Sequence, residues 1–139
     1  MKKFKTILSL LLAVLIAVGT FAGCNDDNDT TEFLETLAFT LELIDSEDKS
    51  EAFNLTTTQT NHDGQGVTTP TLGEVMRTEG LTEQTGLIDT INGITADWDT
   101  DEAYWAFYID GEYALQGIDD TTVKNGAAYK IVYTIGFDE

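Results

Sequence analysis

The chain has 139 residues, a length that suits one domain with one hydrophobic core. It carries 25 Asp and Glu against 7 Lys and Arg, and the net charge of −18 argues against nucleic acid as a partner, because phosphate binding needs a basic surface. One histidine, one cysteine and no glycine-rich phosphate loop argue against an enzyme, so we expect no catalytic residue and no resident cofactor.

Residues 1–23 have the layout of a cleavable export signal. Three of the first five residues are lysines, an apolar run follows, and small residues lie directly before Cys24. The apolar run is shorter than the roughly 20 residues that a membrane span needs. Ala22, Gly23 and Cys24 resemble the end of a bacterial lipobox, in which the cysteine is acylated. We therefore expect lipidation of Cys24 and an outward-facing anchor on the cell membrane, with an ordinary signal peptide as the alternative.

The polar and acidic residues 24–32 predict a flexible tether between this anchor and a folded domain over 33–139. Apolar and polar side chains alternate over residues 34–44 and again over 51–58, which predicts two strands paired as a hairpin. Residues 60–70 show no period and contain two glycines and the sole proline, so we expect a loop there.

At Thr71 the period changes to that of a helix. Thr71 and Glu74 have the spacing of a capping box, in which a hydroxyl and a carboxylate satisfy free backbone N–H groups. Leu72, Val75 and Met76 then share one helical face, and the next glycine suits the left-handed residue that ends a helix. The helix would have about two turns, enough to cover one face of a small sheet.

Residues 86–94 mix short apolar stretches with the turn signal Asn92-Gly93, and an acidic loop around Trp98 follows over 96–102. Three of its aspartates alternate as the first ligands of a calcium loop do. Glu102 occupies the position where such a loop needs glycine, so a solvated acidic loop is the favoured interpretation and no metal ligand is assigned. The aspartates are Asp97, Asp99 and Asp101.

Residues 104–109 alternate and predict a half-buried, aromatic-rich strand that meets the tight turn signal Asp110-Gly111. The short return limb 112–115 runs into Gln116 and a glycine, so polar groups follow directly on the hairpin. Such a place can hold a ligand. Tyr104 and Trp98 fall on the outer face of the strand and in the preceding loop, where they are available for binding.

A second turn signal, Asn125-Gly126, precedes a long alternating segment over 127–137 that we expect to be central in the sheet. One-sided strands with a single short helix predict an α+β fold: a β-grasp-like mixed, mostly antiparallel sheet with one short helix packed on one face. An immunoglobulin-like sandwich is the alternative, and it would require that the capped helix does not form.

Several of these motifs occur together in one known family. Residues 86–133 resemble the transcobalamin-like C-terminal domain, the small β-rich lobe that closes over the corrinoid in animal cobalamin carriers and that also occurs alone in bacterial surface lipoproteins. The matching motifs are the helix pattern 71–76, Ile91-Asn92-Gly93, Tyr104-Trp105, Asp110-Gly111, Leu115-Gln116-Gly117-Ile118 and Lys124-Asn125-Gly126.

The resemblance implies a corrinoid such as cobalamin as ligand, with contacts from Ala114, Leu115 and Gln116. Asn92 and Gln116 are suited to hydrogen bonds with amide substituents of such a ligand. The large helical domain that supplies most corrinoid contacts in the carriers has no counterpart among these residues, and Ala127 stands where the family usually has an acidic residue.

Two functions are compatible with these residues. The first is a membrane-anchored module that captures a corrinoid, or another flat polycyclic ligand, and passes it to an uptake transporter. The second is a surface module that docks onto another protein through the same hairpin or a sheet edge, without a small-molecule ligand.

Overall fold

The computed structural model describes residues 31–62 and 64–136. The expected export signal, Cys24 and the tether up to residue 30 lie outside the described residues. Neither helix in the described ranges has the length and apolar character that crossing a membrane requires. The elements in chain order are β1 (Thr31–Ile44), β2 (Ser50–His62), β3 (Val67–Thr68), α1 (Leu72–Thr78), β4 (Thr90–Ile91), β5 (Ile94–Thr95), α2 (Trp98–Asp101), β6 (Ala103–Ile109), β7 (Glu112–Tyr113) and β8 (Ala128–Ile135).

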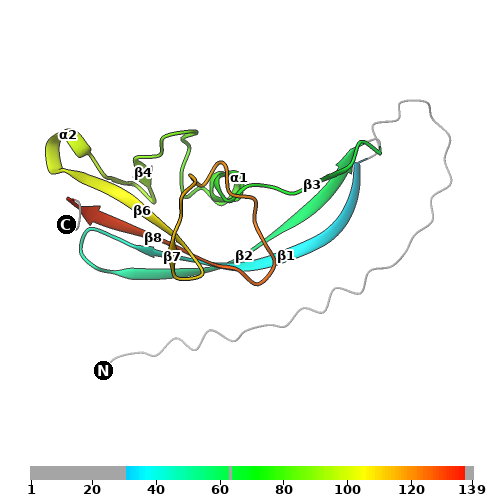
Figure 1. Cartoon of the computed structure of the whole chain (residues 1–139), viewed down its shortest axis with the longest axis horizontal. Coiled ribbons are helices and arrows are strands. Elements are labelled where there is room, and N and C mark those ends of the chain that lie inside the picture. The colour runs from blue at the N-terminus through cyan, green and yellow to red at the C-terminus, as the bar shows by residue number, and fades with distance from the viewer. Residues whose placement is uncertain (1–30, 63, 137–139) are drawn as a thin grey trace, which may run out of the picture.

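Six strands of the described residues form one curved sheet in the order β3-β2-β1-β8-β6-β7, with α1 and the long loops on its concave face (Figure 1). Strands β1 and β8 pair in parallel at the centre, and the other neighbours pair antiparallel. A separate two-stranded sheet joins β4 to β5. The expected α+β class and the central place of the last strand are both confirmed.

The core lies between the sheet and α1. Alternate side chains of β1 point toward the helix, whose Leu72 and Met76 have no exposed area, and Leu41 of β1 has none either. Each such side chain contributes about 1.5 to 3 kcal/mol by leaving water. The opposite face of β1 carries exposed Ala38 and Thr40. The period-2 pattern of the sequence therefore separates a covered face of the sheet from an open one.

Helix α1 begins with the predicted capping box. The N–H of Glu74 donates to Thr71 Oγ1 at 3.2 Å, and the N–H of Thr71 donates to Glu74 Oε2 at 2.8 Å. At the other end Gly80 has a φ of +74°, and the N–H of Leu81 donates to the carbonyl of Met76 at 2.9 Å. This is a left-handed cap of the kind that glycine favours.

Replacing Thr71 by alanine should lower the free energy of unfolding by about 1 kcal/mol, because one N–H of the first turn loses its acceptor. Urea titration followed by circular dichroism measures the change. Thr78→Ala is the matched control, since the Thr78 hydroxyl only donates to the Glu74 carbonyl at 3.0 Å within the helix. Equal stability of Thr71→Ala and the unmodified chain would contradict a stabilising role for the cap.

The structure differs from the expected loop over 60–70. Strand β2 continues to His62, and Thr60 and Asn61 pair with β1 on one side and with β3 on the other. Cross-strand pairing orders this stretch although it has no hydrophobic period, and sequence periodicity does not report such pairing. Strand β1 also starts earlier than expected, at Thr31.

Candidate ligand-binding site

The β6–β7 hairpin turns at Asp110 and Gly111, which have φ of +49° and +85°. Two consecutive positive φ angles match the twist of a two-residue hairpin. The N–H of Asp110 donates to the carbonyl of Ala128 at 2.7 Å, and the Asp110 carboxylate accepts from the N–H of Ala128 at 2.9 Å. The hairpin tip is thereby tied to the start of the central strand β8.

A shallow hollow of about 460 Å³ lies beside this tip and includes Ala114, Leu115 and Gln116 in its lining. Leu115 is 97% exposed and Tyr113 is 57% exposed. The N–H of Ala114 donates to the carbonyl of Phe107 at 2.8 Å, which fixes the start of the loop against β6. The hollow thus presents apolar side chains to solvent from an anchored backbone.

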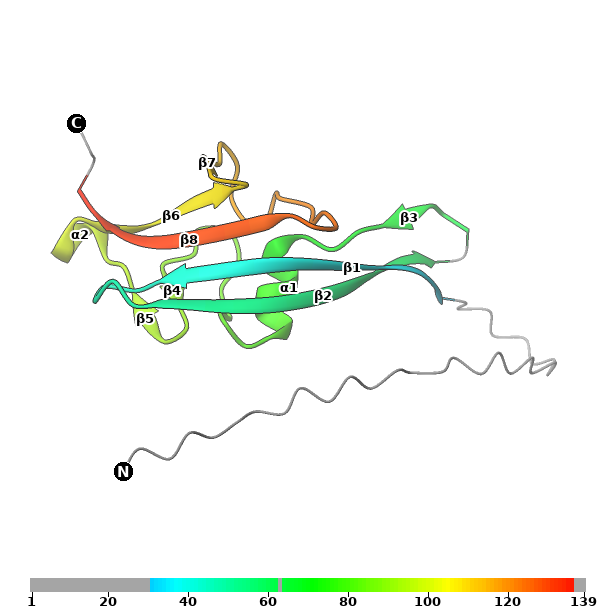
Figure 2. The ribbon, with the colours of Figure 1, turned by 90° about the horizontal axis from the view of Figure 1, so that it is seen from below.

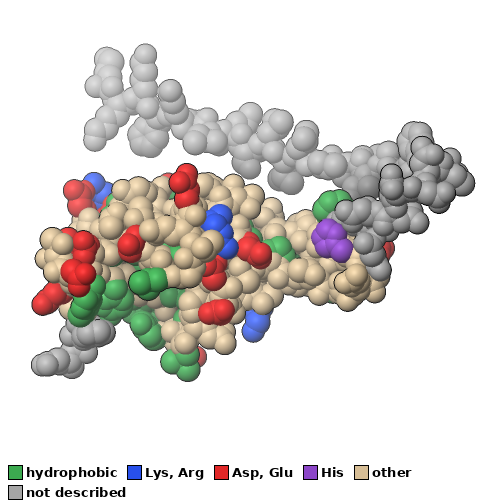
Figure 3. All heavy atoms as spheres, turned by 90° about the horizontal axis from the view of Figure 1, so that it is seen from above, with side chains coloured by type: hydrophobic (Ala, Val, Ile, Leu, Met, Phe, Trp, Pro, Cys, Tyr) green, Lys and Arg blue, Asp and Glu red, His purple; other side chains and the backbone are tan. Residues whose placement is uncertain are grey.

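Hydrophobic side chains gather, among acidic ones, along the edge of the molecule where β6 and β7 lie (Figure 3). Single exposed apolar residues are common on proteins, whereas neighbouring ones beside a hollow mark candidate binding sites.

The loop that follows the hollow is attached to the start of α1. The N–H groups of Leu72 and Gly73 donate to the carbonyls of Thr121 at 2.8 Å and Ile118 at 3.0 Å. The Thr121 hydroxyl donates to the carbonyl of Gly117 at 2.9 Å. Two free N–H groups of the helix are thus satisfied by the loop, which holds the loop in place.

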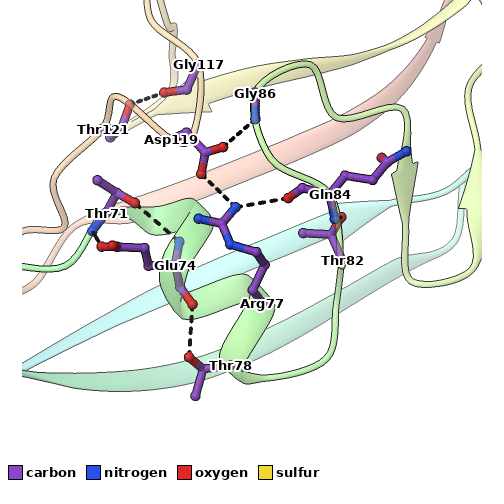
Figure 4. A network of polar contacts seen from close by, with 10 residues as sticks. All are labelled: Thr71, Glu74, Arg77, Thr78, Thr82, Gln84, Gly86, Gly117, Asp119 and Thr121. Carbon is purple, nitrogen blue, oxygen red and sulfur yellow. Dashed lines mark hydrogen bonds and ion pairs between the residues drawn. The ribbon is translucent and has the colours of Figure 1, made fainter.

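An ion pair fixes the same loop from the side (Figure 4). Arg77 Nη1 donates to Asp119 Oδ1 at 2.7 Å and to the carbonyl of Gln84 at 3.0 Å. The N–H of Gly86 donates to Asp119 Oδ2 at 2.7 Å. Partial burial opposes ionisation of Asp119, but the hydrogen bonds from Gly86 and Arg77, with the charge of Arg77, outweigh it and lower its pKa.

Close approach of Asp119 to the helix depends on Gly73. A Cβ atom at this position would lie 1.9 Å from Asp119 Oδ1 and 2.9 Å from its Cγ. Sequence reasoning missed Gly73, Arg77 and Asp119 as a group. The one available signal was that Arg77 is the sole arginine of the chain and follows the apolar face of a predicted helix.

Asn92, one of the predicted ligand contacts, lies in a second place. It occupies the turn between β4 and β5 with a φ of +51°. Its Nδ2 donates to Glu51 Oε2 at 3.2 Å, and it is part of the lining of a separate hollow of about 320 Å³ next to the β1–β2 turn. Its amide is therefore engaged with the first hairpin of the sheet.

Trp98 and Tyr104 lie in a third place, where α2 meets the start of β6. Their rings contact edge to face, with centroids 6.2 Å apart, and Trp98 is 43% exposed. The structure brings Ala114, Leu115 and Gln116 together in one hollow. It places the other three predicted contacts elsewhere.

The acidic loop around Trp98 contains a short helix that the sequence did not predict. Asp97 Oδ1 accepts from the N–H groups of Asp99 at 2.9 Å and Thr100 at 3.2 Å, so this carboxylate caps the start of α2. Within residues 31–62 and 64–136, no three His, Cys, Asp or Glu side chains are grouped so that they could hold a metal ion.

Comparison with known proteins places the fold. Residues 71–134 match the model of a family described as a domain of unknown function, DUF4430. A crystal structure from Ruminococcus gnavus ATCC 29149, described as that of a candidate metal binding protein, superposes with a TM-score of 0.58 and 24% identity over 73% of this chain and 99% of that chain. No curated protein matches the chain.

Haptocorrin in complex with Cbi superposes with a TM-score of 0.55 and 15% identity over 74% of this chain and 26% of that chain. This chain therefore spans about a quarter of haptocorrin. At these identities the likeness shows a shared fold alone. The similarity to haptocorrin fits the transcobalamin-like resemblance loosely, and the matching family model carries no transcobalamin name.

Proposed function

We propose that this chain is a surface binding module that captures a corrinoid, or another flat polycyclic ligand, on the hollow formed by Ala114, Leu115 and Gln116. The observation that carries the proposal is Leu115, a large apolar side chain that is 97% exposed on a loop fixed to β6 and α1. Covering such a side chain with a ligand contributes about 1.5 to 3 kcal/mol.

Neighbouring groups complement the apolar contact. Gln116 offers an amide that can donate to and accept from amide substituents of a ligand. Tyr113 is 57% exposed and contacts Tyr108 edge to face, with ring centroids 5.5 Å apart, so its ring is held in position for stacking. An anchored apolar contact with adjacent polar groups is the usual composition of a small-molecule site.

The relationship to haptocorrin supports the choice of ligand class. Haptocorrin is described in complex with Cbi, and the shared fold covers 26% of the haptocorrin chain. A hollow open to solvent covers one face of a flat ligand, so we expect a dissociation constant in the micromolar range, well above that of a two-domain clamp.

We further infer a β-grasp-like domain held at the outer face of the cell membrane by a lipid on Cys24. In the described residues, two long strands and the two-residue strand β3 precede α1, further strands follow it, and the first and last strands pair in parallel at the centre of the sheet. The export-signal pattern and the small residues before Cys24 support the anchor. An uptake transporter would receive the ligand.

Titration of the detergent-purified full chain with cobinamide, followed by calorimetry, tests the binding. We expect a dissociation constant of roughly 1 to 100 µM and at least a tenfold loss of affinity for Leu115→Asp, because a charge replaces the apolar contact. Leu87→Asp is the matched control: Leu87 is 93% exposed but does not line the hollow. Its affinity should equal that of the unmodified chain.

Absence of heat with cobinamide up to millimolar concentration would refute corrinoid capture. Equal losses of affinity for Leu115→Asp and Leu87→Asp would show that the ligand does not bind in the hollow. The added negative charge alone would then account for the loss.

A further inference from the structure

Strand β2 forms an edge of the large sheet over most of its length. Among the described residues, strand β3 pairs with it only at Thr60 and Asn61. Within the described residues no strand pairs with the outer side of β2 from Ser50 to Gln59 (Figure 2). An edge of this kind presents unpaired N–H and C=O groups to solvent.

The register shows which residues carry these groups. On β1, the N–H of Thr40 donates to Ala127 and the carbonyl of Ala38 accepts from Gly126, so these even-numbered residues face the β8 side. The odd-numbered residues of β1 must then bond to β2, because both polar groups of a strand residue point to one side. Their partners include Phe53, Leu55 and Thr57. The backbone groups of Ala52, Asn54 and Thr56 consequently point outward.

The sequence of this edge lacks charge and proline, two features that commonly block strand addition. Residues 52–60 read AFNLTTTQT, without a charged residue or a proline. Natural edges are commonly protected by lysine, proline, bulges or very short length. The threonines here instead favour extended backbone.

A groove of about 450 Å³ runs beside this edge, between β2 and α1, and Thr56, Thr57 and Thr78 contribute to its lining. Figure 2 shows that the C-terminal end of α1 reaches past β2 on this side. Side chains of an added strand alternate between two faces, so every second one would enter the groove.

The charge of the groove selects its occupant. Glu74 and Glu79 both line it and are exposed. Arg77 lines it as well, but its guanidinium is paired with Asp119 at 2.7 Å. The groove is therefore net acidic. A second copy of the chain is disfavoured, since each copy carries a net charge of −18.

We propose that the outer edge of β2 accepts an extended segment of a partner protein, with Lys or Arg at alternate positions, as an added strand. Main-chain hydrogen bonds to Asn54 and Thr56 supply affinity, and the carboxylates of Glu74 and Glu79 select basic side chains. The outer edge of β2 and the β6–β7 hollow lie toward opposite edges of the sheet, so this edge serves a function separate from ligand capture.

Two synthetic seven-residue peptides of alternating sequence test the proposal, one with lysine and one with glutamate at every second position and valine or threonine between. Each is added to the full chain in detergent, and binding is followed by fluorescence anisotropy and by amide hydrogen exchange. The lysine peptide should bind and should slow amide exchange at Asn54 and Thr56. Added salt should lower its affinity. The glutamate peptide should not bind.

Substitutions at the edge separate backbone from side-chain effects. Thr56→Pro removes one outward N–H without removing a β1–β2 hydrogen bond. It should lower the affinity for the lysine peptide about fivefold or more. Thr56→Ala keeps that N–H and should change the affinity less than twofold. Glu79→Gln leaves the strand unchanged. It should lower the affinity for the lysine peptide and make that affinity less dependent on salt.

Four results would overturn the proposal. They are equal affinity of the two peptides, unchanged exchange at Asn54 and Thr56 with bound peptide, slow exchange at both amides before peptide is added, and self-association of the chain through this edge.

Discussion

Gly73→Ala should lower the free energy of unfolding by about 2 to 3 kcal/mol, although the same change inside a helix usually stabilises by about 1 kcal/mol. The reversed sign follows from the position of Asp119. The new methyl group would lie 1.9 Å from Asp119 Oδ1, so the carboxylate must leave its place and give up Arg77 and Gly86. Urea titration at pH 7 measures the loss.

A double-variant cycle isolates this clash. In the Asp119→Ala background the colliding carboxylate is gone, and Gly73→Ala should then be neutral or stabilising. A loss of the same size in both backgrounds would show that the glycine is needed for another reason.

Asp119→Ala alone should cost about 2 to 3 kcal/mol at pH 7, because it removes two hydrogen bonds to a charged group and leaves the Arg77 guanidinium without its carboxylate. Both side chains of the pair are roughly three-quarters buried, at 24% and 23% exposure, so solvent screens them less than a surface pair. Asp120→Ala is the control, since Asp120 carries the same charge in an exposed position. It should change stability by less than about 0.5 kcal/mol.

The cost of Asp119→Ala should depend on pH in a defined direction. The pKa of Asp119 is lowered in the folded chain, so the unfolded chain takes up a proton first as the pH falls. The stabilisation is complete above the unfolded value near 3.9 and is lost as the pH drops through the folded value. Urea titrations at pH 7, 4 and 3 should therefore show the variant and the unmodified chain converging, and parallel curves would contradict the assigned role.

Local chemistry explains which parts of the fold the sequence could predict. The cap at Thr71, the glycine that ends α1 and the turn at Asp110-Gly111 each depend on a few neighbouring residues, and all three are confirmed. The extension of β2 to His62 depends on pairing with residues some thirty positions earlier. Short-range periodicity in the sequence does not predict that pairing.

The same distinction applies to the candidate site. Ala114, Leu115 and Gln116 are consecutive, so their common position follows from the hairpin that precedes them. Arg77 and Asp119 are 42 positions apart, and nothing local in either segment indicates the other. Residue type made Trp98, Tyr104 and Asn92 candidates for binding, but residue type does not determine where side chains meet.

The parallel pairing at the centre of the sheet has a consequence for how the chain folds. Thr40 is the register partner of Ala128, so the contact spans 128 − 40 = 88 positions. A chain synthesised or threaded from its N-terminus can form the β1–β2 hairpin early, but it cannot close the core until its last strand is present. Such non-local pairing slows folding relative to local contacts. The domain should thus remain open, and competent for passage through a narrow pore, until nearly all of it has emerged.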